Sequence, residues 1–167
     1  MTDRLDRFRR AQDAGQAGFA AALAELRSGR KSGHWIWYIF PQLAGLGQST
    51  ITEFYSIQDA HEAVAYLRDA VLRDRLLAVT AAVAAHLTAD RPVPLQHLMG
   101  SDVDAQKLVS SLTLFGHVAE ALAATEDSGD FRELAELVRV VLEHAEAEGY
   151  PPCSFTLKKL RADRPRV

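Results

Sequence analysis

Residues 31–49 read KSGHWIWYIFPQLAGLGQS and carry both tryptophans of the chain. From Trp35 to Phe40 the sequence is a continuous apolar run, which Pro41 ends. A run of this length is compatible with a buried strand or a buried helical segment, and periodicity does not choose between them. The aromatic residues favour a strand by propensity, whereas the helical patterns on both sides favour a helix. We predict a helix here, followed by an irregular turn at residues 44–49.

Amphipathic helices are predicted on both sides of this segment. Before it, residues 3–28 show an apolar stripe that Gly15 and Gly18 interrupt, so they form one bent helix or two short ones. After it, Asp59 followed by Glu62 marks the N-terminus of another helix. The next helix has the strongest amphipathic pattern in the chain, with apolar side chains at Leu72, Leu76, Val79, Val83 and Leu87.

Two further helices are predicted after the prolines at positions 92 and 94, which cannot continue a helix. One opens at residues 100–102, and the other is capped by Asp130 with Glu133. Its apolar stripe ends before Gly149. The basic residues that follow are Lys158, Lys159, Arg161, Arg164 and Arg166. We expect a solvated, partly frayed end there.

The fold is therefore predicted to be mainly α, a compact irregular bundle of five to six helices. Residues 1–150 form a single helical domain in this prediction, and residues 151–167 form a basic C-terminal tail. A chain of 167 residues with 48% apolar content is long enough to bury a core of its own.

The overall composition excludes several classes of partner. A net charge of -3 does not favour nucleic acid, and no apolar run approaches the roughly 20 residues of a membrane span. The N-terminus lacks the apolar segment of a secretory signal, and the single cysteine fits a reducing compartment, so we expect a cytoplasmic protein. The six histidines have neither an i, i+4 pair nor a partner cysteine, so we predict no metal and no cofactor.

The helix after residue 100 carries a polar strip beside its apolar stripe. At 100° per residue, Asp104, Lys107 and Ser111 lie within about 60° of one another. Ser110 stands next to Ser111 in a hydroxyl-rich stretch that a plain core helix would fill with alanine. Such hydroxyls either bond to the preceding turn, or permit a close helix crossing, or line a ligand site. Lys107 is either a contact for an anion or a solvated surface residue, and Asp102 or Asp104 is the candidate helix cap.

The central segment holds a second group of candidate residues. His34 is a candidate general base, or alternatively a capping residue. Trp35 and Trp37 point to different faces in any secondary structure, so at most one of them lines a cleft for a ring-bearing ligand. The turn that follows could cradle an anion with backbone amides and hydroxyls, using Gln42, Gly47 and Ser49.

Familiar catalytic motifs are absent from the sequence. There is no phosphate-binding GK[ST] loop and no GxSxG nucleophile turn, and Cys153 has no histidine near it in sequence. Covalent catalysis is therefore disfavoured. Two carboxylates facing one cleft would suit cleavage of a glycosidic bond. The carboxylates available are Glu53, Asp59, Glu62, Asp102 and Asp104.

The blocks KSGHWIWYIFPQLAGLGQS, EAVAYL, RLL and DAQKLVSSLTLF resemble, in this order, those of an uncharacterised bacterial family, domain-of-unknown-function family 1810. The resemblance covers about residues 5–141 and implies a mainly helical fold without a settled activity. The family pattern would place a threonine at Glu133, so this chain departs from it there. The order of the blocks is also loosely similar to that of small helical proteins that hydrolyse N-glycosidic bonds in ADP-ribose-type nucleotides.

The sequence leads to two functional hypotheses. In the first, a cleft binds a phosphate- and ring-bearing molecule, nucleotide-like or ADP-ribose-like, and a hydrolase reaction at an N-glycosidic bond uses His34 and Asp104. The expected ligand-binding residues are Trp35, Trp37, Gln42, Gly47, Ser49, Lys107, Ser110 and Ser111. In the second, the protein is a non-catalytic interaction module that grips another protein with an exposed aromatic edge. The oligomeric state is left open.

Overall fold

The structure is a computed structural model that describes residues 3–163, and in this range it contains ten helices and no strand beyond one bridge between Leu43 and Ile57. The helices are α1 (Asp6–Gln12), α2 (Phe19–Ser28), α3 (Ile36–Ile39), α4 (Thr50–Tyr55), α5 (Ala60–Arg68), α6 (Ala70–Leu87), α7 (Leu95–Met99), α8 (Asp102–Thr125), α9 (Gly129–Ala147) and α10 (Ser154–Ala162). The mainly helical prediction is confirmed, but the predicted count of five to six was too low. Helices of four to seven residues have too few turns to show a period in the sequence.

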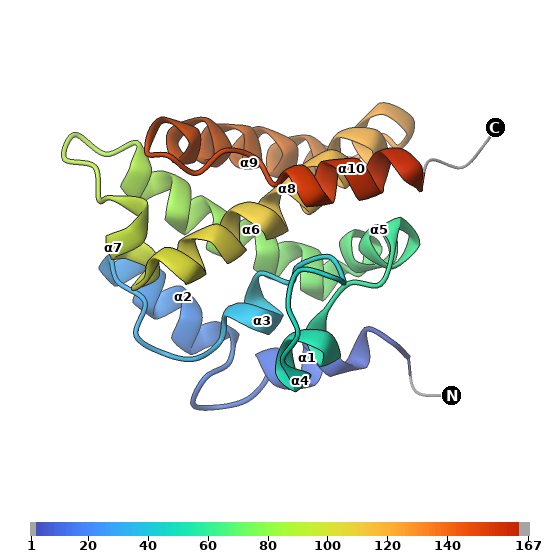
Figure 1. Cartoon of the computed structure of the whole chain (residues 1–167), viewed down its shortest axis with the longest axis horizontal. Coiled ribbons are helices and arrows are strands. Elements are labelled where there is room, and N and C mark those ends of the chain that lie inside the picture. The colour runs from blue at the N-terminus through green and yellow to red at the C-terminus, as the bar shows by residue number, and fades with distance from the viewer. Residues whose placement is uncertain (1–2, 164–167) are drawn as a thin grey trace.

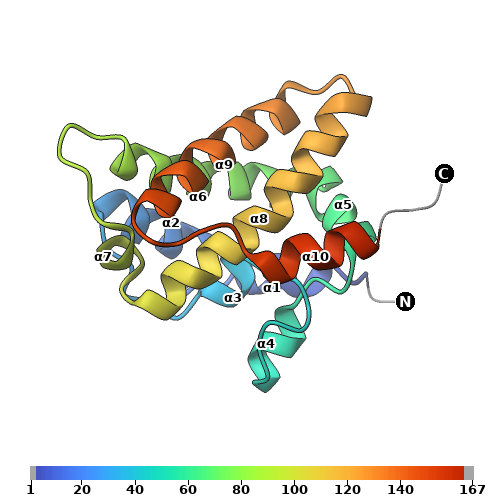
Figure 2. The same cartoon turned by 45° about the horizontal axis from the view of Figure 1, so that its top comes forward.

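Helix α8 runs through the middle of the molecule (Figures 1 and 2) and packs against α3, α5, α7, α9 and α10. An 18-residue window of this helix is long and apolar enough to cross a membrane, by length and composition only. The sequence analysis had found no run of this kind. However, 67% of that window is buried inside the protein, so burial by neighbouring helices accounts for its apolar character.

The central segment forms α3, which confirms the predicted helix, and the irregular turn before α4 is confirmed as well. Trp35 and Phe40 are completely buried and pack against each other with their ring centroids 6.4 Å apart. Deeper in the core, the ring of Tyr66 packs against those of Phe8 and Phe115. The aromatic residues that favoured a strand by propensity therefore form the packed centre of a helical core.

Residues 3–28 form two helices, α1 and α2, separated by the segment that contains both glycines. Gly18 has no room for a side chain, because a Cβ there would lie 2.1 Å from the carbonyl oxygen of Ala14. The sequence analysis left one bent helix or two short ones open, and this tight turn explains why the chain makes two.

The helix caps agree only in part with the predictions. The side chain of Asp59 accepts a hydrogen bond from the Glu62 N–H at 2.8 Å, as expected. Helix α8 is capped instead by Ser101, whose Oγ accepts from the Asp104 N–H at 3.1 Å, so neither Asp102 nor Asp104 is the cap. Helix α9 begins at Gly129 without a side-chain cap, so the predicted cap by Asp130 was wrong.

The prediction of a frayed tail was wrong for residues 154–162, which form α10 and pack against α8. Thr156 and Leu160, one turn apart, are the buried residues of this helix, whereas its basic residues Lys158 and Arg161 are exposed. Arg164 and Arg166, which belonged to the same prediction, lie outside the described residues.

The crossing of α8 and α9 generates a stability prediction. A Cβ at Gly116 would lie 2.6 Å from Cγ1 of Val138, which is itself buried, so Gly116→Ala should force the helices apart and cost about 1–3 kcal/mol. Gly129→Ala is the matched control, because no atom lies within 4 Å of its Cβ position. Urea unfolding measures both, and equal midpoints for the two variants would contradict the prediction.

Candidate functional site

A buried ion pair joins the central segment to α8. The ammonium group of Lys31 lies 2.8 Å from Oδ2 of Asp104, and these side chains are only 6% and 18% exposed. Lys31 also donates a hydrogen bond to the carbonyl oxygen of Gly33, and its ammonium lies 5.0 Å from the centroid of the Trp35 ring. Asp104, a predicted catalytic residue, is therefore engaged by a lysine that the sequence analysis did not single out.

Glu25 fixes the turn that leads into Trp35. Its Oε1 accepts hydrogen bonds from the backbone N–H groups of Ser32 and Gly33. Burial raises the pKa of Glu25, but these amide hydrogen bonds outweigh burial and hold the pKa below its ordinary value. A Cβ at Gly33 would lie 2.9 Å from both Glu25 Oε2 and Trp35 Cδ1, so this turn requires glycine. Glu25 precedes the central segment in the chain, and its spacing gave no signal of this role.

The two tryptophans occupy different environments. Trp35 is fully buried, whereas Trp37 is half-buried, and the ammonium of Lys107 lies 5.4 Å from the centroid of its ring. His34 is exposed at the start of this segment. The structure thus brings Trp37 and Lys107 together across α3 and α8, while Trp35 belongs to the core.

The residues of the predicted anion cradle in the turn mainly make contacts that stabilise the fold. Gln42 accepts a hydrogen bond from the Ile57 N–H with its backbone carbonyl. Gly47 packs against Thr52 beside a hollow of about 340 Å³, and the Ser49 hydroxyl caps α4. These three residues lie together near α4, apart from the contact between Trp37 and Lys107.

Ser110 and Ser111 have opposite environments, although they are adjacent in sequence. Ser111 is fully buried and its hydroxyl has no hydrogen-bond partner among the described residues. Ser110 instead lines a cavity of about 560 Å³. On a helix, the cavity-lining face of α8 and the face that carries Asp104, Lys107 and Ser111 point roughly 150° apart, so the predicted residues do not share one site.

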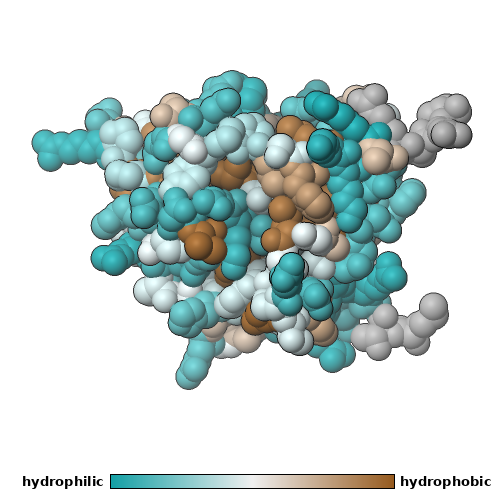
Figure 3. Space-filling model, in the orientation of Figure 1, coloured by the Kyte–Doolittle hydropathy of each residue, from teal (hydrophilic) through white to brown (hydrophobic). Residues whose placement is uncertain are grey.

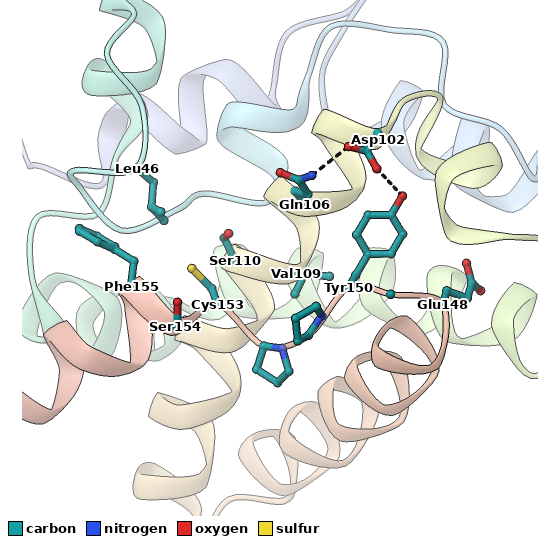
Figure 4. A pocket seen from close by; sticks show the side chains of 13 residues that line it. Leu46, Asp102, Gln106, Val109, Ser110, Glu148, Tyr150, Cys153, Ser154 and Phe155 are labelled. Atoms are coloured by element: carbon teal, nitrogen blue, oxygen red, sulfur yellow. Dashed lines mark hydrogen bonds between the residues drawn. The ribbon is translucent and has the colours of Figure 1, made fainter.

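The cavity lies between α8, the loop after α3 and the connection from α9 to α10 (Figure 4). Its lining residues are Leu46, Asp102, Gln106, Val109, Ser110, Glu148, Gly149, Tyr150, Pro151, Pro152, Cys153, Ser154 and Phe155. Leu46 and Phe155 border one end of it, and a polar cluster borders the other. The lining therefore combines apolar walls with a few convergent polar groups, as small-molecule sites do.

The polar end of the cavity is organised by Asp102. Its Oδ1 accepts a hydrogen bond from the Tyr150 hydroxyl at 2.7 Å, and its Oδ2 accepts one from the Gln106 amide at 2.9 Å. The hydrogen bond to Asp102 raises the pKa of Tyr150 to about 12, because ionisation of the phenol would destroy it. Asp102 thus positions an aromatic ring at the wall of the cavity.

The hydroxyl-rich stretch of α8 acts on Cys153. The Thr113 hydroxyl donates to the Val109 carbonyl and accepts a hydrogen bond from the Cys153 N–H at 3.1 Å. Ser110, one turn earlier on the same face of α8, stands beside the Cys153 thiol in Figure 4. The Thr113 hydroxyl therefore holds the start of α10 in place, and this gives the hydroxyl a role that packing alone does not.

Several cavity residues were missed by the sequence analysis, namely Gln106, Tyr150, Cys153 and Phe155. The signal that points to the last three is the segment GYPPCSFT, in which Gly149 and two prolines end one helix and Cys153 precedes the next. Within residues 3–163, no three histidine, cysteine or carboxylate side chains come close enough to hold a metal ion.

The protein is a single helical domain in which an ion pair between Lys31 and Asp104 joins the upstream KSGHW segment to the central apolar helix α8. These features define the class of this protein. The chain belongs to the family described as "Protein of unknown function (DUF1810)", whose model matches residues 2–130. The resemblance read from the sequence is confirmed by this match.

The fold is also similar to that of a solved structure, the crystal structure of the conserved hypothetical protein Rv1873 from Mycobacterium tuberculosis at 1.38 Å. The two chains are 31% identical with a TM-score of 0.75, over 94% of this chain and 96% of that chain. No curated protein matches the chain. The family match ends before Tyr150 and Cys153, whereas the structural match extends over nearly the whole fold.

Removal of one partner of the buried ion pair should be costly. Asp104→Ala leaves the Lys31 ammonium buried without a counter-charge, and we expect a loss of about 3 kcal/mol in the free energy of unfolding. Lys107→Ala, one turn along the same helix, is the control and should cost less than about 1 kcal/mol. Chemical denaturation compares the two, and the assignment fails if Asp104→Ala is no more destabilising than Lys107→Ala.

Tyr150 should show its contact with Asp102 in a titration. Its folded pKa is raised, so the contact stabilises the protein fully below the ordinary tyrosine pKa of about 10 and is lost as the pH rises to about 12. In ¹³C NMR of labelled tyrosine, Tyr150 should titrate near 12, and Asp102→Asn should return it towards 10. Tyr150→Phe assigns the signal, and an unchanged pKa in Asp102→Asn would refute the contact.

Proposed function

We propose that this protein binds a small, ring-bearing molecule in the cavity between α8 and the connection from α9 to α10. The observation that carries the proposal is the convergence of Asp102, Gln106, Ser110, Tyr150 and Cys153 on one cavity of about 560 Å³. This volume lies within the range of roughly 300–1,000 Å³ that ligand pockets occupy. The ring of Tyr150, held by Asp102, supplies a wall on which a ligand ring can stack.

The charge of the lining selects the kind of ligand. Asp102 and Glu148 contribute two carboxylates, and no lysine or arginine belongs to the lining residues described above. A phosphate group would therefore meet repulsion here, whereas an uncharged or cationic molecule would not. A nucleoside-like compound, with a ring and hydroxyl groups but without phosphate, fits this lining better than the nucleotide that the sequence favoured.

The nucleotide hypothesis has its support on the opposite face of α8. There, the Lys107 ammonium lies over the half-buried Trp37 ring, and His34 is exposed nearby in the chain. A phosphate contact by Lys107 and ring stacking on Trp37 form this second candidate site. Because Lys31 engages Asp104, His34 is the residue left to activate water in a hydrolase reaction at an N-glycosidic bond.

The interaction-module hypothesis is supported by α4, which projects from the rest of the molecule in Figure 2. Ile51 and Phe54 on this helix are 40% and 57% exposed. The face shown in Figure 3 is mostly hydrophilic with separate small apolar patches, and this favours a small-molecule site over a broad protein interface. A cytoplasmic location, expected from the single cysteine, is part of the proposal.

Thermal unfolding with a panel of nucleosides, nucleotides and ADP-ribose tests the proposal. A nucleoside-like ligand at about 100 times its Kd should stabilise the protein by about 2.7 kcal/mol, which corresponds to a rise in Tm of about 5 °C or more. Tyr150→Ala should abolish this rise, and Lys107→Ala should leave it unchanged.

The panel also separates the candidate sites. A rise confined to phosphate-bearing compounds and lost in Lys107→Ala would replace the cavity with the Trp37 face. A flat response to every compound would contradict both small-molecule sites.

A further inference from the structure

Two uncompensated carboxylates line the polar end of the cavity. Asp102 and Glu148 are both exposed there, and no lysine or arginine belongs to the lining. Asp102 accepts hydrogen bonds from the Tyr150 hydroxyl and the Gln106 amide. Glu148 accepts one from the Leu95 N–H at 2.7 Å. Because all three donors are neutral, the two negative charges remain, and this end of the cavity has a negative potential.

Carboxylates alone are typical of a solvated surface, but an aromatic ring stands beside Asp102. The Tyr150 hydroxyl donates to Asp102 at 2.7 Å, so the ring is held at the cavity wall next to the carboxylate (Figure 4). An aromatic face attracts a cation that lies within about 6 Å of its centroid. A cation bound by Asp102 can therefore also contact the ring of Tyr150.

The hydroxyl of Ser110 is an independent observation that points to a ligand. Ser110 is only 9% exposed, and it lines the cavity from α8 (Figure 4). Its hydroxyl makes no hydrogen bond to an oxygen or nitrogen atom of the described residues, and the Cys153 thiol beside it is a weak acceptor. A buried hydroxyl without a partner is costly, whereas a polar group of a ligand in the cavity would satisfy it.

The opposite end of the cavity is apolar, with Leu46 and Phe155 at its border (Figure 4). Lys159 of α10 is not part of the lining, because its ammonium group donates to the Ala44 carbonyl at 3.1 Å. Lys107 lies on the other face of α8. The uncharged part of a ligand thus has an apolar wall, and neither ammonium group offsets the acidic end.

We infer that the cavity selects a ring-bearing molecule with a positive charge, such as a nucleoside with a cationic base, over the neutral form of the same molecule. The charge lies between the Asp102 carboxylate and the ring of Tyr150, and the Ser110 hydroxyl bonds to a neutral polar group of the ligand. This inference rests on the proposed function and narrows its ligand class from uncharged or cationic to cationic. An uncharged nucleoside occupies the same cavity more weakly.

Isothermal titration calorimetry with methylated nucleosides tests the inference. The base of 1-methyladenosine is cationic at neutral pH, whereas N⁶-methyladenosine is neutral, and the two differ by one proton and the position of the methyl group. The pair 3-methylcytidine and 5-methylcytidine differs in the same way. Each cation should bind at least about fivefold more tightly than its neutral partner, which is the ratio for one charge pair about 4 Å apart in water. Equal Kd values within both pairs would overturn the inference.

Matched variants identify the groups that set the preference. Asp102→Asn keeps an oxygen acceptor for the Tyr150 hydroxyl but removes the charge, so the preference for the cation should fall to about twofold or less. Ser110→Ala should weaken the cation and its neutral partner alike, by about two- to tenfold for one lost hydrogen bond. Glu146→Gln is the control, because it removes the same charge from an exposed residue of α9 outside the lining. An equal loss of preference in Glu146→Gln and Asp102→Asn would contradict the inference.

Salt provides a second measurement that needs no variant. The two carboxylates are exposed, so their attraction for a cation is screened by added sodium chloride. The preference for 1-methyladenosine should therefore shrink as the salt concentration rises, while the Kd of N⁶-methyladenosine changes little. A preference that is the same at low and high salt would show that charge does not cause it, and this result would also overturn the inference.

The outcome is separable from that of the proposed function. Cationic and neutral nucleosides that bind equally well, and that both lose binding in Tyr150→Ala, would keep the binding function and overturn the charge selection. A preference for the cation that is lost in Asp102→Asn, together with binding that is lost in Tyr150→Ala, supports both. Binding that is unchanged in both variants would place the ligand outside this cavity and overturn both.

Discussion

The buried contact between Lys31 and Asp104 is the constraint on which the arrangement of this molecule depends. It joins two segments that lie some seventy residues apart in the sequence and holds the turn before Trp35 against the start of α8. A buried charge pair contributes little net stability but is very costly to break, so it specifies which segments meet. The N–H of Lys31 also bonds to the Leu98 carbonyl, so one residue fixes the central segment to two helices of the core.

With α8 fixed in this way, its faces serve different purposes. One face carries Asp104, Lys107 and Ser111 and binds the central segment, which supplies packing and the contact between Lys107 and Trp37. The other face carries Asp102, Gln106 and Ser110 and borders the cavity. A single helix thus orders the core and presents polar groups to the cavity, because residues four apart lie on the same face and adjacent residues do not.

The sequence predicted much of the fold and less of the site, for identifiable reasons. The cap at Asp59 and the helix ending at Leu87 follow from local patterns that tertiary packing does not override. The helix at Ile36–Ile39 was instead predicted from its helical neighbours, against the strand propensity of its aromatic residues. Helix α10 was missed because its apolar stripe is short and its basic residues are typical of a solvated tail. The pairing of Lys31 with Asp104 and the closeness of Ser110 to Cys153 depend on long-range packing, which no local spacing encodes.

The two halves of the cavity lining come from different parts of the chain. Asp102, Gln106 and Ser110 lie inside the range that matches the family, whereas Tyr150, Cys153 and Phe155 lie beyond residue 130. The family-matched half anchors the second half through Thr113 of α8, whose hydroxyl accepts a hydrogen bond from the Cys153 N–H. A change in the short segment before α10 would then alter the chemistry of the cavity without disturbing the core. The scaffold is therefore set by the buried ion pair and α8, and the second wall of the cavity is set by the segment that connects α9 to α10.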